Sequence, residues 1–431
     1  MKIETNNKTA GRLAIILTLI YAFTTRSILA GFLYRTQIQL LLFYAITYLL
    51  LGLCFLRSFD RTEGHLYAKR GFYSILCVTA VIIYELFAAG NTYSLLYYGM
   101  ALLLPFAIDD EIIMTTWLPK FFVAISAFFS IGCFVNFVLP SAYKAVILPM
   151  FSANAQQSLL EVEKLSGSGT YFAGFTSQVG YTSFFISMGI GAVFCFKGTV
   201  IKRISYPLII IMFAALLLTG KRGPLMFLLI ALAAIYFMDG YGRERILRVA
   251  KIALMLCLAY GILTVIARAT QIDGILRIYD AVNELLTSGS VEDAGRSQLY
   301  EQALMYFRQH PLFGIGWANF KSLYSFRGTH VHCIYFQLLC ETGLVGTAIF
   351  VIFFVSRLVA SARSIKTTMN EVPIIENGWM KFSFFIQLYF LLYGITGNPL
   401  YDIEETILYF FAVGVSLIQL SGWSTGLENE K

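Results

Sequence analysis

Charged residues are scarce in this sequence. Of its 431 residues, 58% are hydrophobic and only 13% are charged, and the mean hydropathy is +0.71. Because soluble domains carry about 25% charged residues, the composition excludes an ordinary soluble enzyme and indicates a polytopic membrane protein. The long apolar runs also exclude an outer-membrane barrel, whose strands alternate apolar and polar residues.

Cysteine and histidine patterns typical of metal or disulfide frameworks are missing. The seven cysteines lie in or beside apolar runs, and no Cys-x-x-Cys pair occurs, so neither a disulfide framework nor a structural zinc site is expected. The net charge is +7, but Lys and Arg cluster between apolar runs. This pattern indicates membrane orientation rather than a nucleic-acid partner.

Twelve apolar segments approach the roughly 20 residues that a spanning helix needs. They cover residues 13–33, 38–56, 71–89, 92–108, 117–138, 177–196, 204–220, 223–238, 246–267, 333–355, 380–397 and 403–420. Thr24, Thr25 and Arg26 interrupt the first segment. We therefore predict an all-α polytopic membrane protein with about twelve transmembrane helices, forming a single transmembrane domain over residues 1–431.

The distribution of basic residues predicts the orientation of this domain. With all twelve segments spanning, most Lys and Arg residues fall in loops on the side of the two termini, which places both termini in the cytoplasm. Two long outer loops remain, at 139–176 and 268–332, and long loops often carry function. In the second loop, apolar residues recur at helical spacing after Ile272 and again after Ser297, which predicts two amphipathic helices against the outer membrane face.

A basic pair, Lys221 and Arg222, lies at the outer junction of two predicted spans, against the orientation rule. One interpretation is that both side chains extend to the lipid headgroups. The other is an anion site, because Arg matches phosphate oxygens in pairs and the start of the following helix adds amide donors. The role of Lys221 beside Arg222 stays open.

Further cations accumulate in the second outer loop. Arg296 precedes its second predicted helix, and Arg308 and Arg327 follow. Each is an ordinary solvated charge when taken alone, but together with Arg268, Arg277 and Lys321 they would form a positive field that attracts an anionic lipid head.

Two of the four histidines, His330 and His332, end this loop where a span begins. Metal binding is disfavoured, because residues at i and i+2 do not share a helix face. The remaining interpretations are a structural histidine and a general base, since His titrates near neutral pH. Asp402 follows the Asn398–Pro399 break, near Glu404 and Glu405. Such a carboxylate could orient the histidine, line a sugar cleft, or end a helix in solvent.

Three stretches resemble the O-antigen ligase and O-antigen polymerase superfamily of bacterial membrane glycosyltransferases. They are TGKRGPLM, GRSQLYEQALMYFRQHPLFGIGWANF and HCIYFQLLCETGLVGT. The third is similar to a family pattern in which nine residues separate a His and its polar neighbour from Gly-x-x-Gly-Thr. Here the histidine is His332, but Cys333 replaces the usual polar neighbour.

The resemblance implies glycosyl transfer on the outer face of the bacterial inner (plasma) membrane, without a cofactor or metal. The implied donor and acceptor are glycans linked to undecaprenyl diphosphate. Arg222 and Arg296 would stabilise the departing diphosphate, and His332 would deprotonate the acceptor hydroxyl. Lys221, His330, Arg308, Arg327 and Asp402 are candidate substrate-binding residues. A chain-length regulator and a flippase are the implied protein partners.

The particular reaction stays open at this point. A polysaccharide repeat-unit polymerase, for O-antigen, capsule or exopolysaccharide, is favoured over an O-antigen ligase that transfers a finished glycan to lipid A core. A twelve-helix transporter or a lipid-linked oligosaccharide flippase are the alternatives from other classes. Both place ionisable residues near mid-membrane or along a central cavity, whereas the candidate residues here cluster at one face.

Overall fold

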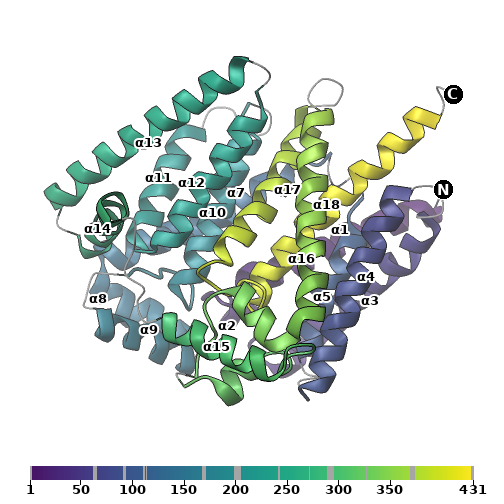
Figure 1. The fold of residues 1–431 in the computed structure, drawn as a ribbon, viewed down its shortest axis with the longest axis horizontal. Helices are drawn as coiled ribbons and strands as arrows, with labels where there is room; N and C mark the ends of the chain where they lie inside the picture. The colour runs from purple at the N-terminus through teal and green to yellow at the C-terminus, as the bar shows by residue number, and fades with distance from the viewer. Residues whose placement is uncertain are drawn as a thin grey trace.

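The computed structural model describes residues 2–61, 66–90, 94–109, 112, 114–166, 171–198, 205–240, 243–270, 272–288, 296–326, 328–368 and 374–428. Helices dominate these ranges (Figure 1), and the only strand-like pairing within them is an isolated bridge between Ser27 and Thr176. The predicted all-helical class is therefore confirmed.

Every predicted span contains a helix. These are α1 (Lys2–Thr24), α3 (Gln37–Arg61), α4 (Leu66–Ala88), α5 (Leu95–Leu103) with η2 (Leu104–Ala107), α7 (Trp117–Val138), α10 (Val179–Cys195), α11 (Ser205–Leu218), α12 (Arg222–Met238), α13 (Arg243–Thr270), α16 (Ile334–Thr368), α17 (Ile374–Tyr393) and α18 (Ile403–Glu428). In the described ranges, α3, α7, α13 and α16 are long and apolar enough to cross a membrane, and six further apolar helices are shorter. The count of twelve spans and the cytoplasmic termini stay predictions.

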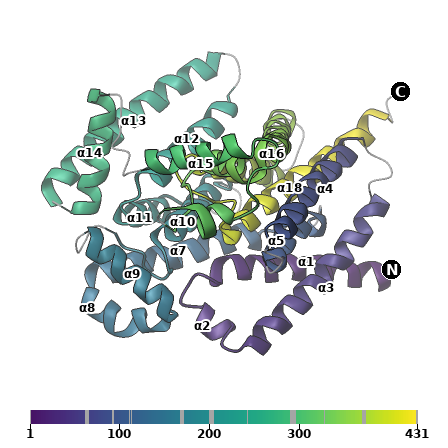
Figure 2. The same cartoon turned by 60° about the horizontal axis from the view of Figure 1, so that its bottom comes forward.

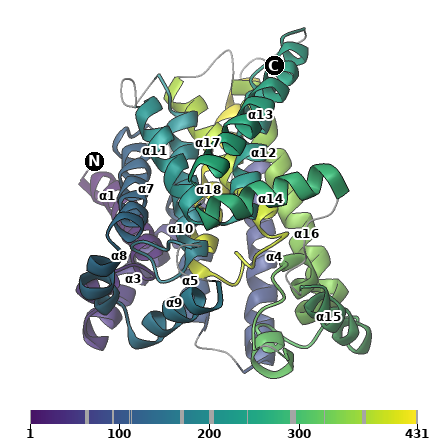
Figure 3. The same cartoon turned by 90° about the vertical axis from the view of Figure 1, so that its left-hand side faces the viewer.

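Helix α1 starts and helix α18 ends toward the same end of the bundle, the upper end in Figure 1. The short elements α2 (Ala30–Leu33), α8 (Pro140–Ala142), η3 (Tyr143–Ile147), η4 (Leu148–Met150), α9 (Ala153–Ser166), α15 (Ser297–Gln309) and η5 (Phe320–Tyr324) belong to the opposite end. Figure 3 shows α8, α9 and α15 together at that end, which we call the outer end in keeping with the predicted orientation. The predicted loop 268–332 contains two helices, α14 (Asp273–Ser288) and α15.

The first predicted span, 13–33, is wrong in its second half, because α1 ends at Thr24. Beyond that residue the backbone pairs with the segment before α10: Ser177 N donates to Arg26 O at 2.7 Å, and Ile28 N donates to Phe175 O at 3.0 Å. The Arg26 side chain pairs with Glu404 at 3.0 Å. These tertiary bonds replace the helical ones, so the charge at Arg26 marks the end of the helix.

Helices α13 and α14 stand apart from the remaining bundle (Figure 2). The apolar window of α13 has no buried residues, and Ile246 and Val265 are 72% and 67% exposed. An apolar helix with this exposure is stable where lipid surrounds it, because its backbone groups are satisfied internally and its side chains avoid water. The exposure therefore agrees with a membrane protein.

Helix α16 is broken at Gly343, whose φ is +62°. The break frees the next backbone amide from helical bonding, and Leu344 N donates instead to Pro311 O at 2.9 Å. Gly314, with φ +69°, packs so closely that a Cβ there would lie 2.3 Å from the Glu341 carbonyl. The segment after α15 is thus bonded into the broken helix, and glycine is required on both sides of the contact.

Candidate functional site

The turn 394–402 between α17 and α18 brings two distant segments together. On one side, Ile334 N at the start of α16 donates to Gly394 O at 2.9 Å. On the other side, Gly223 at the start of α12 lies so close that a Cβ would be 2.7 Å from Thr396 Oγ1. Arg222 directly precedes Gly223, and His332 lies two residues before Ile334. Both residues therefore flank the same turn at the outer end.

Lys221 and Arg296 form a cationic pair beside this turn. Burial lowers the pKa of Lys221, and the positive charge of Arg296 lowers it further. Arg296 also acts on Cys333: burial raises the pKa of that thiol, and the Arg296 charge partly opposes the rise. Within the described ranges no carboxylate forms an ion pair with either cation. Lys221 is half-buried, and a partly desolvated lysine held near an arginine without a carboxylate is suited to binding an anion.

Aromatic contacts support the lysine side of this pair. Lys221 Nζ lies 5.5 Å from the ring centroid of Tyr171, and the Arg277 guanidinium lies 5.0 Å from the same ring. Cations over an aromatic face are stabilised by the ring without a counter-ion. Tyr171 therefore helps keep Lys221 in place while leaving its charge uncompensated.

Arg222 occupies a different environment. It lines a cavity of about 400 Å³ together with Asp273, Asp280 and Glu284 of α14, and with Arg277. Three carboxylates and two arginines give this cavity a negative balance, so it is not itself a phosphate pocket. Lys221 and Arg296 are not offset by such carboxylates in the described ranges, and Arg222 follows Lys221 at the start of α12.

His332 is exposed and has φ +60°, a left-handed conformation that is uncommon for residues other than glycine. With the Asn398 amide oriented to suit its neighbours, its oxygen accepts from His332 N at 3.1 Å and its nitrogen donates to Gln337 Oε1 at 3.1 Å. This backbone bond stabilises the strained residue, as expected where a side chain is held in a set direction. Cys333, in place of the family's polar residue, is buried.

His330 is held by a buried amide. Gln337 Nε2 lies 2.7 Å from His330 Nδ1 and also donates to Glu341 Oε1 at 3.1 Å. Burial, together with the charges of Lys321 and His332, lowers the pKa of His330 to about 3. His330 is therefore neutral at physiological pH, with its proton on Nε2, and is a poor proton acceptor. This favours the structural interpretation for His330.

Glu341 anchors the outer segment 317–320 to α16. Its Oε2 accepts from Ala318 N at 2.8 Å, and its Oε1 accepts from Phe320 N at 3.2 Å. The sequence analysis did not single out Gln337 or Glu341. Their signal was available, because two polar residues at i and i+4 share one face of an otherwise apolar helix.

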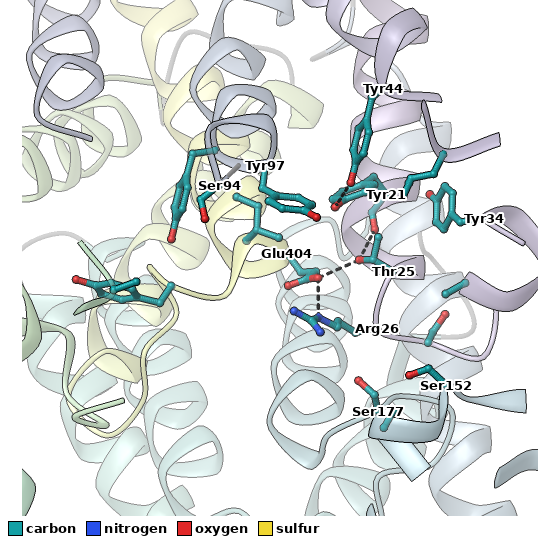
Figure 4. A pocket seen from close by; sticks show the side chains of 18 of the residues that line it. Tyr21, Thr25, Arg26, Tyr34, Tyr44, Ser94, Tyr97, Ser152, Ser177 and Glu404 are labelled. Atoms are coloured by element: carbon teal, nitrogen blue, oxygen red, sulfur yellow. Dashed lines mark hydrogen bonds and ion pairs between the residues drawn. The ribbon is translucent and has the colours of Figure 1, made fainter. Parts of the chain in front are cut away.

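A second and larger cavity, of about 1070 Å³, lies at the outer end beside His330. Its walls come from the outer ends of α1 and α3, from the segment before α5, from η4 and α9, from residues 317–322 and from the turn before α18. Figure 4 shows Arg26 and Thr25 both directed at Glu404, whose Oε1 accepts from each at 3.0 Å. Glu404 is 2% exposed and Arg26 is 49% exposed, so the arginine offers its free side to the cavity.

The remaining predicted residues lie elsewhere. Asp402 accepts from Tyr181 OH at 2.7 Å, and burial raises its pKa to about 6. Arg308 is exposed in the last turn of α15, and Arg327 lies outside the described residues.

The structure thus brings Lys221, Arg296 and His332 to one turn, with Arg222 and His330 on either side of it. Neither of the two cavities includes Arg296 or His332 among its described lining residues.

A metal centre is not formed by the described part of the chain. No group of three or more His, Cys, Asp or Glu side chains there is arranged to hold an ion.

Comparison with known protein families indicates which family this part of the chain is similar to. Residues 207–351 match the model of the O-antigen ligase family, a family of membrane glycosyltransferase-like ligases. The segment contains Lys221, Arg222, Arg296, His330 and His332, and it ends after the break in α16. The resemblance to the O-antigen ligase and polymerase superfamily is therefore confirmed for this segment. No curated protein matches the chain.

Proposed function

We propose that the protein is a polysaccharide repeat-unit polymerase. It transfers a glycan from undecaprenyl diphosphate to a sugar hydroxyl of a second lipid-linked glycan, on the outer face of the inner membrane. The observation that carries the proposal is the half-buried Lys221, whose charge interacts with that of Arg296 and which has no carboxylate partner among the described residues. Arg296 in turn acts on Cys333, the residue after His332. A diphosphate supplies the missing negative charge.

The reaction follows from these groups. The acceptor oxygen forms a bond to the anomeric carbon of the donor, and the bond from that carbon to the diphosphate breaks, so the electron pair leaves with the diphosphate. Arg296 and Lys221 stabilise the charge that develops on the leaving group. His332 takes the proton of the acceptor hydroxyl. Attack from the opposite face inverts the anomeric centre, and no metal is required.

Arg222 takes part from the start of α12, where the helix dipole also favours an anion. Its present neighbours on α14 are carboxylates. A diphosphate at Lys221 and Arg296 carries more charge than any one of them, so donor binding draws Arg222 away from α14. Arg308 and Arg327 belong to the positive field that attracts the donor. Asp402, directly before the outer end of α18, contributes to substrate binding.

A ligase is the second candidate, favoured by the description of the matching family. A deletion strain distinguishes the two activities through its surface glycan. Single repeat units on undecaprenyl diphosphate would identify a polymerase, and long chains stranded on that lipid would identify a ligase. Normal surface polysaccharide would exclude both.

Substitutions test the assignment of residues. Arg222→Ala, Arg296→Ala and His332→Ala should each abolish elongation while the protein remains at its normal level in the membrane. His310→Ala is the matched control, because His310 is exposed at the end of α15 and lines neither cavity. Full-length polymer from the His332→Ala strain would disprove the general base.

A further inference from the structure

The cavity beside His330 has the size and lining of an oligosaccharide site. Its volume of about 1070 Å³ lies at the upper end of the range for small-molecule sites. Aromatic side chains make up much of its wall, contributed by Tyr21, Tyr34, Tyr44, Tyr97, Tyr98, Trp317 and Tyr401. Tyr34, Tyr97 and Tyr401 are partly exposed and offer an apolar face for the C–H face of a sugar. The other four rings are buried and support this surface from behind.

The aromatic wall is ordered before any ligand binds. Trp317 stacks on Tyr401 with ring centroids 4.7 Å apart. His330 also packs against Tyr401, with ring centroids 5.2 Å apart. On the opposite wall, the hydroxyls of Tyr21 and Tyr44 are 2.9 Å apart (Figure 4). Rigid rings lose little conformational entropy on binding.

The charged lining favours an acidic sugar. Three cations, Arg26, Arg35 and Lys321, and one carboxylate, Glu404, line the cavity, and His330 is neutral. Glu404 is already bonded to Arg26 and Thr25. Arg35 and Lys321 are exposed, and in the described ranges neither forms an ion pair with a carboxylate. Two cations from distant segments, α2–α3 and η5, thus remain for a negatively charged ligand.

The cavity also adjoins the reacting groups. Gln337 bonds to His330 on the cavity wall and to Asn398, whose amide holds the His332 backbone. The cationic pair of Lys221 and Arg296 lies on the other side of the same turn. A glycan in the cavity and a diphosphate at the pair would therefore approach His332 from two sides.

We propose that this cavity binds the acceptor glycan, and that this glycan is an acidic oligosaccharide whose carboxylates contact Arg35 and Lys321. The inference rests on the proposed function and adds to it the class of the acceptor. Arg26, held by Glu404, donates hydrogen bonds to sugar hydroxyls, and the partly exposed tyrosines give stacking surface. The reacting end of the bound glycan passes His330 and reaches His332.

Calorimetry on the purified full-length protein in detergent tests the inference. The probes are tetragalacturonate and its carboxyl-reduced, neutral counterpart. We expect the acidic probe to bind at least about five-fold more tightly, with the preference weakening at high salt. Arg35→Gln and Lys321→Gln should each reduce that preference, whereas Lys251→Gln, an exposed change in α13 that lines neither cavity, should preserve it. No binding of either probe, or equal binding of both, would overturn the inference.

Elongation assays separate this inference from the proposed function. Arg35→Gln combined with Lys321→Gln should raise the acceptor KM and shorten the polymer without removing the chemical step. If His332→Ala abolishes elongation but the double variant leaves the acceptor KM unchanged, the acceptor site is wrong and the enzyme assignment stands. If the acidic probe binds as expected but His332→Ala retains full elongation, the catalytic assignment is wrong and the cavity remains a binding site for an acidic glycan.

Discussion

The side-chain amide of Gln337 donates to Nδ1 of His330 at 2.7 Å, and the same amide group reaches Glu341 and the Val331 backbone. One side chain of α16 therefore fixes both the tautomer of a cavity histidine and the course of the loop that leads to His332.

Replacing Gln337 tests this relationship. Gln337→Leu leaves the Val331 amide and Glu341 Oε1 with fewer partners, and each unsatisfied buried group costs about 1–3 kcal/mol. We expect a lower melting temperature in detergent and loss of elongation. Gln387→Leu is the matched control, because Gln387 is equally buried in α17 and its amide nitrogen donates to the Ser383 hydroxyl. Similar loss of elongation in both variants would contradict a specific role for Gln337.

The break in α16 predicts an intolerant glycine. In Gly343→Ala the new Cβ lies 2.4 Å from the Leu312 backbone, at a φ of +62°. The left-handed conformation costs an L-residue about 1–2 kcal/mol, and the contact with the backbone adds to this. We expect a sharp drop in folded protein, measured by size-exclusion chromatography in detergent. Gly261→Ala in α13, where a Cβ meets nothing within 4 Å, should fold normally, and equal yields from both would contradict the bonded contact.

The pH dependence of stability should show opposite effects from two buried groups. The pKa of His330 falls from 6.5 to about 3 on folding. Between these values the unfolded chain binds a proton that the folded chain excludes, so this group lowers stability as the pH falls. The pKa of Asp402 rises from 3.8 to about 6. Between these values the folded chain binds the extra proton, so this group raises stability as the pH falls.

Melting temperatures at pH 7.5 and pH 4.5 separate the two effects. On acidification, His330→Gln should gain stability relative to the wild type, because it lacks the excluded proton. Asp402→Asn should lose stability relative to the wild type over the same change. Parallel behaviour of both variants would show that neither group is coupled to folding as its burial requires.

Arg296→Lys tests whether geometry or charge alone matters. An ammonium keeps the positive charge but cannot bind two phosphate oxygens in one plane. We expect elongation to fall about 100-fold, the usual cost of removing a transition-state donor, with normal protein in the membrane. Arg268→Lys should elongate normally. Retained activity of Arg296→Lys would indicate simple charge attraction.

Hydropathy was sufficient to predict the helices, because each span must satisfy its backbone internally and expose apolar side chains to lipid. It failed at residues 25–33, where Ser177 and Glu404 compete with helix formation through contacts distant in sequence. The basic pair and the paired histidines were visible as departures from the expected pattern. The sequence did not show that Lys221 lies near Arg296, that Arg222 faces the carboxylates of α14, or that Gln337 holds His330. These contacts depend on how the turn 394–402 packs.

The cavity was likewise outside the reach of periodicity. Its tyrosines are spread over α1, the end of α2, α3, α5 and the turn before α18, and each one alone resembles an interfacial aromatic. Arg26 was visible only as an interruption of a span. Its pairing with Glu404 joins residues nearly four hundred positions apart, which a single sequence does not indicate.

The broken helix also limits which part of the outer end can move. Ile315 N and Gly316 N donate to Cys340 O and Glu341 O, and Leu344 N donates to Pro311 O, so the stretch after α15 is fastened to a membrane helix at several points. A hinged cover over the reacting groups cannot be built from it. For the lipid-linked substrate that we propose, the flank formed by α13 and α14, where apolar side chains are exposed, is the side that this fastened segment leaves open, and such a substrate would enter laterally from the bilayer.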